Sequence, residues 1–517
     1  MELFPVPSTP THYTEFRRLP GATSESTKVL RKLLLENHEK WHIMFNDEGF
    51  HNHISHHLLA LWSLGASAES LQKAYDAEID QQRPIKISED VVPITEDNFC
   101  DHLGEQRFYQ PYLTFFESQI TSLGPVETLV KFVFSPQFNS GNGKMLNRYH
   151  AGVLHPFIHV GYGLEFKLPG MVSEGLAMAC VTQADPTDLL TSLTESSLGT
   201  ASSFLTQALS SLSLLSTQQV PLTVPPSPHA LDFLTKIDED PSYDMERTPL
   251  MSREFFEKYE NKIGGFVKEW FAPGSSEGGT LLKIIEKKAE ELVWMNTVIY
   301  AAGYTNSAPT LDKFKADFFT MHLVTSSLFL SSHIQAMQSH HPHAVVALLQ
   351  AYFATALSLY IVRRGGRPIN LIHFYRNTEY VVRPGYNLRP EANVRSEANN
   401  TGSDNAKGTN NTGPDSDAKN VWTSIIESSL TKEDEHYPKL QRALMHYSVL
   451  YGLKTSGDIF GSLPDVEEGS NRQEGSESAN GFGMLDGSTF WRAAALTQER
   501  VASVTGGDTN DYWDFGG

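Results

Sequence analysis

Apolar residues recur at three- and four-residue spacings along most of this chain, and that spacing is typical of amphipathic helices packed on a core. The clearest helical stretches are Thr27–Phe45, His56–Leu64, Glu69–Asp76, Leu281–Tyr300, Leu311–Met337 and Pro342–Val362, with a last helix at Phe490–Val504. Strand-like alternation is confined to two short segments, Ile85–Val92 and Glu379–Val382. The pattern predicts a mostly α fold, a large single helical domain with few short strands.

Three polar segments interrupt the helical pattern. Ser196–Ser216 runs into a proline-rich linker, residues 392–420 are predicted to be a disordered surface insertion, and residues 464–489 form an acidic flexible linker. We therefore expect a helical body made of residues 1–391 and completed by residues 421–463. A C-terminal helix and tail, residues 490–517, would follow, and the closing aromatic sequence YWDF predicts that the tail anchors onto the body.

Charge and composition restrict the partners of this chain. Apolar residues make up 40 % and charged residues 20 %, which is ordinary for a globular protein with a sizeable core. The formal net charge of −20 argues against nucleic acid and against anionic membranes, because their phosphate groups would be repelled. Residues 344–362 are nearly long enough to span a bilayer, but Gln350, Thr355 and Ser358 interrupt them. We predict a buried core helix there and no membrane attachment.

Cysteine usage and the N-terminus point to the cytoplasm. Only Cys100 and Cys180 are present, which excludes a disulfide framework or a zinc site built on cysteines and fits a reducing compartment. The N-terminal sequence lacks the basic start and apolar run of a secretory signal.

The unusual feature of the composition is 20 histidines, since imidazole near neutral pH is both a metal ligand and a proton carrier. The densest cluster is His51, His53, His56 and His57, followed by apolar residues that predict a helix entering the core. His53 and His57 lie one turn apart and would share a face. A metal site and a histidine-rich helix end with one satisfied core imidazole are equally consistent with this cluster.

Three further segments carry candidate ligands. His150, His155 and His159 form a second cluster, in which Glu165 is a candidate to orient a ligand imidazole. His322 stands alone in an apolar helix, where a core residue is the commoner role. His436 and Lys439 lie three apart at a predicted helix start behind an acidic run, and for this segment alone a surface ion pair is the natural interpretation of that spacing.

Familiar short signatures give little support to other chemistries. His38 and His42 with Glu39 fit HExxH, but no third zinc ligand is identifiable, and the segment also fits the polar face of an amphipathic helix. Residues 274–278 fit GxSxG without a strand before them. The sequence contains no GxGxxG that opens a βαβ unit, so a Rossmann-type flavin or nicotinamide site has no support.

Four motifs occur in a fixed order: NHISHHLLALWSLGAS, GVLHPFIHVGYGLEF, MHLVTSSLFL and DEHYPKLQRAL. Together they resemble the questin oxidase-like family, fungal enzymes of aromatic polyketide pathways that include Baeyer–Villiger oxidases and openers of an anthraquinone ring. The resemblance implies a largely helical fold and a mononuclear iron held by four histidines and a carboxylated lysine. It assigns the first motif's Asn-His to Asn52 and His53, and the remaining ligands to His155, His322, His436 and Lys439. His56 and His57 are alternatives to His53, and His159 is the alternative to His155.

The function implied by the resemblance is an Fe(II)-dependent oxygenase that uses O2 to cleave a ring of an anthraquinone-like aromatic polyketide in fungal secondary metabolism. The histidines not used as ligands, His56, His57 and His159, are then candidates to position a phenol or relay a proton. Tyr162 and Trp62 are candidates to stack on a flat substrate, with core packing the other role for Trp62. A reductase would be a partner if it supplied the reduced quinone.

Two other functions stay open. The first is an NADPH-dependent Baeyer–Villiger monooxygenase without a metal, in which the cofactor would be NADPH. The second is a non-catalytic helical protein that binds a small molecule, with structural histidines only. The consumption of NADPH separates the first from a dioxygenase, and the absence of bound metal would characterise the second.

Overall fold

The most apolar stretch of the chain forms the central helix of the computed structural model, α15 (Pro342–Arg364). By length and composition this helix could cross a membrane, but every residue of its most apolar window is buried inside the protein. Gln350, Thr355 and Ser358 are among its buried residues, and the two hydroxyls donate to backbone carbonyls one turn earlier. This is the packing of a core helix, as the interrupting polar residues predicted.

The structure describes residues 1–86, 90–194, 196, 227–272, 281–303, 314–382, 420–460, 481–504 and 509–516. These residues form 19 α-helices in a single helical domain and no sheet, which confirms the predicted fold class. Besides α15, the α-helices are α1 (Ser24–Lys40), α2 (Ile54–Ser63), α3 (Ala68–Glu78), α4 (Tyr109–Leu123), α5 (Pro125–Leu129), α6 (Met145–His150), α7 (His155–Phe166), α8 (Pro169–Val181), α10 (Ala230–Glu239), α11 (Arg253–Trp270), α12 (Leu281–Ala302), α13 (Phe318–Ser327), α14 (Leu330–Met337), α16 (Leu371–Asn377), α17 (Val421–Ser429), α18 (His436–Tyr451), α19 (Ser456–Phe460) and α20 (Ser488–Ser503).

Short helical turns connect these elements. One is a π-helical turn, η3 (Val130–Phe134). The others are 3-10 turns: η1 (Ile79–Gln81), η2 (Gln106–Phe108), η4 (Pro136–Phe138), η5 (Pro241–Tyr243), η7 (Glu379–Val382), η9 (Phe482–Met484) and η10 (Thr509–Tyr512).

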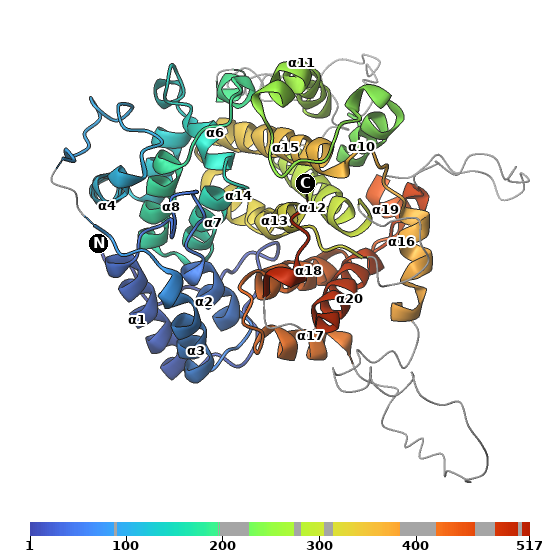
Figure 1. Cartoon of the computed structure of the whole chain (residues 1–517), viewed down its shortest axis with the longest axis horizontal. Helices are drawn as coiled ribbons and strands as arrows, with labels where there is room; N and C mark the ends of the chain where they lie inside the picture. The colour runs from blue at the N-terminus through green and yellow to red at the C-terminus, as the bar shows by residue number, and fades with distance from the viewer. Residues whose placement is uncertain are drawn as a thin grey trace, which may run out of the picture.

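Four helices from distant parts of the sequence meet in a closed ring. Helix α2 packs on α7 and α18, and α13 packs on the same two helices from the other side. Figure 1 shows α1–α3 at one edge, α12, α13 and α15 through the middle, and α17, α18 and α20 beside them. The C-terminus returns to the middle of the molecule, where Asp514 pairs with Asp317 in an isolated bridge. The ring of α2, α7, α13 and α18 positions the candidate site.

Both strand predictions are wrong in the described residues. Glu379–Val382 forms the 3-10 turn η7. In the other segment residues 87–89 lie outside the described part, and the rest of it forms no strand. In the predicted helix Leu311–Met337, residues 311–313 lie outside the described part, and the rest contains two helices, α13 and α14. In the predicted helix Thr27–Phe45, regular structure ends at Lys40, because Trp41 turns to an extended conformation and bridges to Pro84.

Several predicted segments fall largely outside the described residues. They are most of Ser196–Ser216, the insertion at residues 392–419, the linker at residues 464–480 and the GxSxG sequence at residues 274–278. The proposed division into body, linkers and tail therefore stays a prediction.

A buried carboxylate joins the central helix to the rest of the fold. Asp317 is fully buried and accepts from Thr320 N at 2.8 Å, which caps the start of α13. The same side chain accepts from the buried Arg363 at the end of α15, at 3.0 and 2.6 Å, and from Arg247. The buried guanidinium of Arg363 and the half-buried guanidinium of Arg247 share this carboxylate, and loss of its charge would leave the Arg363 cation buried without an anion.

We predict that Asp317→Asn lowers the free energy of unfolding by roughly 3–5 kcal/mol, because Arg363 is then left buried without an anion. Urea denaturation followed by circular dichroism measures the change. Asp458→Asn is the control, since Asp458 is an exposed acid that accepts from Thr455 N, and a much smaller change in the free energy of unfolding is expected there. Equal effects of the two substitutions would contradict the role given to Asp317.

Candidate metal centre

Four histidines, one from each helix of the ring, converge in the interior. His53 precedes the first turn of α2, His155 begins α7, His322 lies in α13 and His436 begins α18. Successive imidazole centroids are separated by 4.8 Å (His53 to His155), 4.8 Å (His155 to His322), 5.2 Å (His322 to His436) and 4.7 Å (His436 to His53). The rings thus close a circle, like the helices that carry them.

The Nδ1 atom of each ring lies against an oxygen acceptor. The acceptors are Glu435 Oε1 for His53 at 3.0 Å and for His436 at 3.2 Å, Gly152 O for His155 at 2.6 Å and Phe318 O for His322 at 2.8 Å. Because a carbonyl or carboxylate oxygen only accepts, each Nδ1 carries the proton and donates it. The tautomer of each ring is thereby fixed: its Nε2 is bare, which here means that it carries no hydrogen and presents its lone pair.

The four bare Nε2 atoms fit a metal ion. Those of His322 and His436 are buried with no hydrogen-bond partner among the described residues. Those of His53 and His155 face each other at 2.7 Å, where two lone pairs would repel unless a positive charge lay between them. Ligand atoms of His53, His155 and His436 all lie within 4.8 Å of one another. Imidazole nitrogen suits iron, zinc and copper, so the donor set fits a divalent transition metal.

Burial keeps three of the imidazoles, those of His53, His155 and His322, neutral, which metal binding requires. It lowers the pKa of His53, His155 and His322 well below its usual value. The neighbouring imidazoles lower it further, because each ring would repel the charge of the next.

Lys439 lies one turn after His436 on α18 and is also buried. Burial lowers the pKa of Lys439. The positive charge of its ammonium contributes to the lowered pKa of His53 and of His322. Asp434 Oδ1 caps this helix by accepting from His436 N at 3.0 Å and from Tyr437 N at 2.7 Å. The acidic run before the helix therefore positions His436 and Lys439 in the interior, instead of forming a surface ion pair.

The backbone before His155 is strained. Gly152, Val153 and Leu154 have φ angles of 56°, 54° and 66°, which are uncommon for residues with a side chain and most of all for a β-branched one. This left-handed run turns Gly152 O toward His155 Nδ1. It also needs glycine at its first position, because a Cβ there would lie 2.9 Å from His51 Cε1. Strain of this kind is commonly retained at functional sites.

A cavity of about 510 Å³ reaches this centre. Its polar lining consists of three histidines, four acids and two glutamines (His51, His53, His436, Glu78, Glu433, Asp434, Glu435, Gln81 and Gln82), and its aromatic lining of Phe45, Phe50, Phe318, Trp513 and Phe515. A concave site that combines aromatic rings with convergent polar groups can bind and orient a small molecule. This volume is large enough for a molecule of several fused rings.

The other candidate histidines lie beside the centre but have partners of their own. His56 Nε2 lies 3.0 Å from His159 Nδ1, and His159 Nε2 lies 2.7 Å from Glu174 Oε2. The chain continues through His38, at 2.7 Å from Glu174, to Glu117 at 3.0 Å. Since Glu117 is 28 % exposed, this row of buried groups connects the interior next to His53 with solvent.

The contacts correct the expectation for Glu165 and define the partners of three other candidate residues. Glu165 pairs with Arg442 and not with a histidine of the cluster. His57 Nδ1 lies 2.6 Å from Glu78 Oε1, within hydrogen-bond distance. Tyr162 is buried and stacks on His56 at 5.2 Å. Trp62 is buried and donates to Thr27, so its role is packing.

The HExxH sequence does not form a site in this structure. Helix α1 ends before His42, whose two ring nitrogens lie 3.0 Å from Met44 O and Gln106 O. His38 faces Glu174 and Glu117 instead. Both histidines are buried, so the interpretation as an exposed polar helix face is wrong, although the conclusion that they are not a zinc pair agrees with these contacts.

Sequence reasoning missed the carboxylates that orient the histidines. Glu435 was visible in the sequence only as part of an acidic run at a helix start, yet one of its oxygens holds both His53 and His436. Glu174 lies in α8 without any local signal, because its partners His159 and His38 lie on other helices, 15 and 136 residues away.

The fold and the cluster define an all-helical protein with a buried histidine centre beneath an aromatic cavity. The sequence profile of the questin oxidase-like family matches residues 50–444. That range includes all four histidines and Lys439. The chain belongs to the questin oxidase-like family.

Relatives of this chain are named as oxidising enzymes of fungi. It is 30 % identical over 338 residues to the Baeyer-Villiger monooxygenase dmxR6 of Cryptosporiopsis sp., covering 65 % of this chain and 70 % of the relative. It is 29 % identical over 316 residues to the Baeyer-Villiger oxidase GME11358 of Pestalotiopsis microspora, covering 60 % and 65 %. It is 36 % identical over 164 residues to the oxidoreductase AflY of Aspergillus parasiticus, covering 31 % and 32 %. The chain is an oxidoreductase.

The buried row of His38 and Glu174 makes stability depend on pH. Burial acts to lower the pKa of His38, but hydrogen bonds to Glu117 and Glu174 outweigh it and raise the pKa to about 10. Burial acts to raise the pKa of Glu174, but hydrogen bonds to His159 and His38 lower it to about 2. The stabilisation from His38 is complete below its unfolded pKa of 6.5 and is lost as pH rises through 10. That from Glu174 is complete above 4.5 and is lost as pH falls toward 2.

We therefore predict that the free energy of unfolding of the wild type decreases between pH 7 and pH 10 more steeply than that of His38→Gln, which has no imidazolium to lose. Chemical denaturation at pH 6, 8 and 10 measures both proteins. His340→Gln, at an exposed position, is the control and should follow the wild type. Parallel pH dependence in wild type and His38→Gln would refute the charged pair.

Proposed function

We propose that this chain is a non-haem iron oxygenase that uses O2 to cleave a ring of an anthraquinone-like aromatic polyketide. The observation that carries the proposal is the set of four buried imidazoles whose Nε2 atoms are bare and converge beside an aromatic cavity. Bound Fe(II) would supply a centre that binds dioxygen and exchanges electrons with it. The polyketide assignment rests on the family and on the width and aromatic walls of the cavity.

Lys439 is proposed as the fifth ligand, in carboxylated form. Four neutral imidazoles leave the double charge of the metal uncompensated in a dry interior, and an ammonium beside it would be repelled. Carbon dioxide can add to the neutral amine of Lys439 by forming an Nζ–C bond with loss of a proton, which gives an anionic oxygen donor. The lowered pKa of Lys439 and its burial next to the histidines favour that reaction.

The residues of the cavity would bind and orient the substrate. Phe318 and Phe45 supply flat apolar surface for an aromatic ring system. Glu78 lies on the cavity wall with His57 behind it at 2.6 Å, so this pair could accept the proton of a phenol. Holding the ring in one orientation decides which carbon–carbon bond meets the oxidant.

His56 and His159 are proposed to move protons between the centre and solvent. His56 Nδ1 has no partner among the described residues, and its other nitrogen begins the row through His159 and Glu174 that ends at Glu117. Each contact in this row is 3.0 Å or shorter, within hydrogen-bond range.

A panel of variants purified without added metal tests the centre. We expect about one iron per chain in the wild type and a roughly tenfold or greater loss in His322→Ala. His333→Ala is a matched control, because His333 also donates Nδ1 to a backbone carbonyl in an apolar helix, but its Nε2 is satisfied by Tyr149 at 2.6 Å. That variant should keep its iron. Lys439→Arg should lose iron like Lys439→Ala, because a guanidinium cannot be carboxylated. Full iron content in the Lys439 variants would exclude the carbamate.

Iron content and turnover, measured on the same panel, distinguish residues that move protons from residues that bind the metal. His159→Gln should keep its iron and lose about a hundredfold in turnover, within the range that general acid–base groups contribute. Unchanged turnover in this variant would remove His159 from the mechanism.

The second candidate is the NADPH-dependent Baeyer–Villiger monooxygenase, which the names of several relatives favour. A ring-cleaving dioxygenase places both atoms of O2 in the product of an already reduced substrate and consumes no NADPH. A monooxygenase places one atom in the product, reduces the other to water and consumes one NADPH per turnover. We expect oxygen uptake without NADPH consumption on a chemically reduced hydroxyanthraquinone. A strict requirement for NADPH in metal-free protein would support the second candidate instead.

A reductase that supplies the reduced quinone remains a proposed partner, and the cytoplasmic location stays a prediction.

A further inference from the structure

We propose that the C-terminal segment, residues 511–516, forms the specificity-determining wall of the cavity, with Phe515 in direct contact with the substrate ring. This inference rests on the proposed function, since the substrate is the flat aromatic molecule named there. Trp513 and Phe515 line the cavity together with His53 and His436. The segment lies beyond residues 50–444, the part of the chain that matches the family profile.

The segment is held by main-chain contacts at the start of α13. Asp514 N donates to Ala316 O at 2.8 Å, and Phe318 N donates to Asp514 O at 3.1 Å. These two bonds form the isolated bridge with Asp317. They attach the tail to the same residues that lead into the helix of His322.

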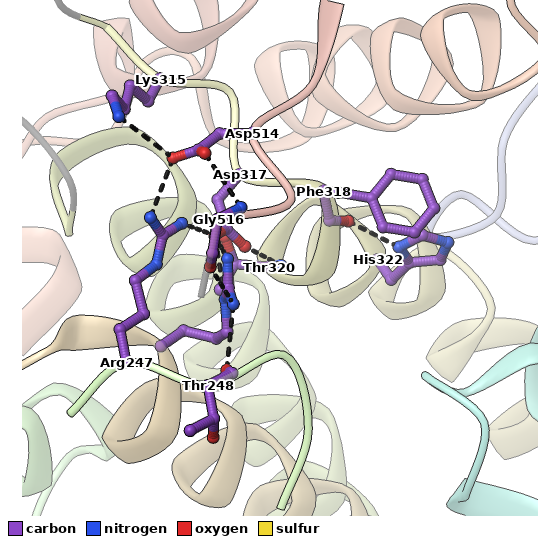
Figure 2. A network of polar contacts seen from close by, with 10 residues as sticks. Arg247, Thr248, Lys315, Asp317, Phe318, Thr320, His322, Asp514 and Gly516 are labelled. Carbon is purple, nitrogen blue, oxygen red and sulfur yellow. Dashed lines mark hydrogen bonds and ion pairs between the residues drawn. The ribbon is translucent and has the colours of Figure 1, made fainter. Parts of the chain in front are cut away.

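Ionic contacts reinforce this attachment. The Asp514 carboxylate accepts from Arg247 at 2.9 Å and lies 3.9 Å from Lys315. Gly516 O accepts from Arg363 Nη1 at 2.8 Å. Figure 2 shows these contacts converging on one side of α13, with Phe318 and His322 following on the same helix. Arg247 and Arg363 also bind Asp317, so the tail is tied to the buried charge network of the fold.

Phe515 adds an aromatic layer over the centre. It stacks on Phe318 with a centroid distance of 4.4 Å and an interplanar angle of 29°. Phe318 in turn lies 4.9 Å from the rings of both His322 and His436. Phe515 is nevertheless 37 % exposed, although its backbone neighbours are firmly bound. A flat substrate entering the cavity would cover this exposed aromatic face, and aromatic pairs prefer such offset stacking.

Trp513 has a different task, which is to position a ligand. Its indole Nε1 donates to Asp434 Oδ2 at 3.0 Å, while Asp434 Oδ1 caps the first turn of α18. The tail thus orients the cap that holds His436 in place. Trp513 acts through Asp434, whereas Phe515 acts on the substrate itself.

The two residues can be separated by binding and metal measurements on full-length protein. The probe is 1,8-dihydroxyanthraquinone, titrated by its visible absorption, and iron content is measured on the same samples. Phe515→Ala should weaken probe binding about tenfold, equivalent to about 1.4 kcal/mol, and leave iron content unchanged. Trp513→Phe keeps a ring but removes the indole N–H, and it should lower iron content with little change in probe affinity. Tyr13→Ala, which removes an exposed aromatic outside the cavity, is the control and should change neither.

The outcomes distinguish this inference from the proposed function. If the wild type holds iron but binds the probe no better than Phe515→Ala, Phe515 does not contact the substrate and the inference about the C-terminal segment is wrong. The proposed metal centre would be unaffected by that result. Unchanged iron in Trp513→Phe would overturn the positioning role. Wild type with neither iron nor probe binding would overturn the proposed function, and the inference with it.

Discussion

The charge of Asp317 is the constraint on which much of this structure depends. A carboxylate with no exposed surface is stable in the interior only if donors surround it, and here they come from three separate parts of the chain. Arg363 ends the central helix, Arg247 binds the C-terminal tail, and the backbone of Thr320 begins the helix of His322. One buried charge therefore sets the position of the core helix, of a candidate ligand and of one wall of the cavity relative to each other.

The sequence predicted the helices and the candidate ligands better than their surroundings. Helical periodicity is a local property, so α15 and the long helices could be recognised without knowledge of the fold. The strand prediction for Glu379–Val382 was wrong, because an alternation over four residues fits a strand and a 3-10 turn equally well. The four ordered motifs marked His53, His155, His322 and His436 through a family resemblance, and the structure brings them together, although their role as ligands stays a prediction.

The groups that orient these histidines could not be predicted, and the reason is physical. A ligand motif has a spacing within one helix, but an acceptor such as Glu174 is defined only by the packing of α8 against α7 and α1. Glu435 is next to His436 in sequence, yet its contact with His53 spans 382 residues. The tail was predicted to anchor on the body from its aromatic residues. Its place beside the candidate centre followed from the bridge to α13, which no sequence pattern encodes.

The closed ring of helices also has a consequence for the assembly of the protein. Each bare imidazole nitrogen comes from a different helix, and the first and last of them are separated by most of the chain. During synthesis, a growing polypeptide that ends before α18 has only three of these donors and no Lys439. Only a complete, folded chain would therefore bind a redox-active metal ion with the full affinity of the centre. With the proposed iron in this centre, such an arrangement would keep incomplete chains from activating oxygen.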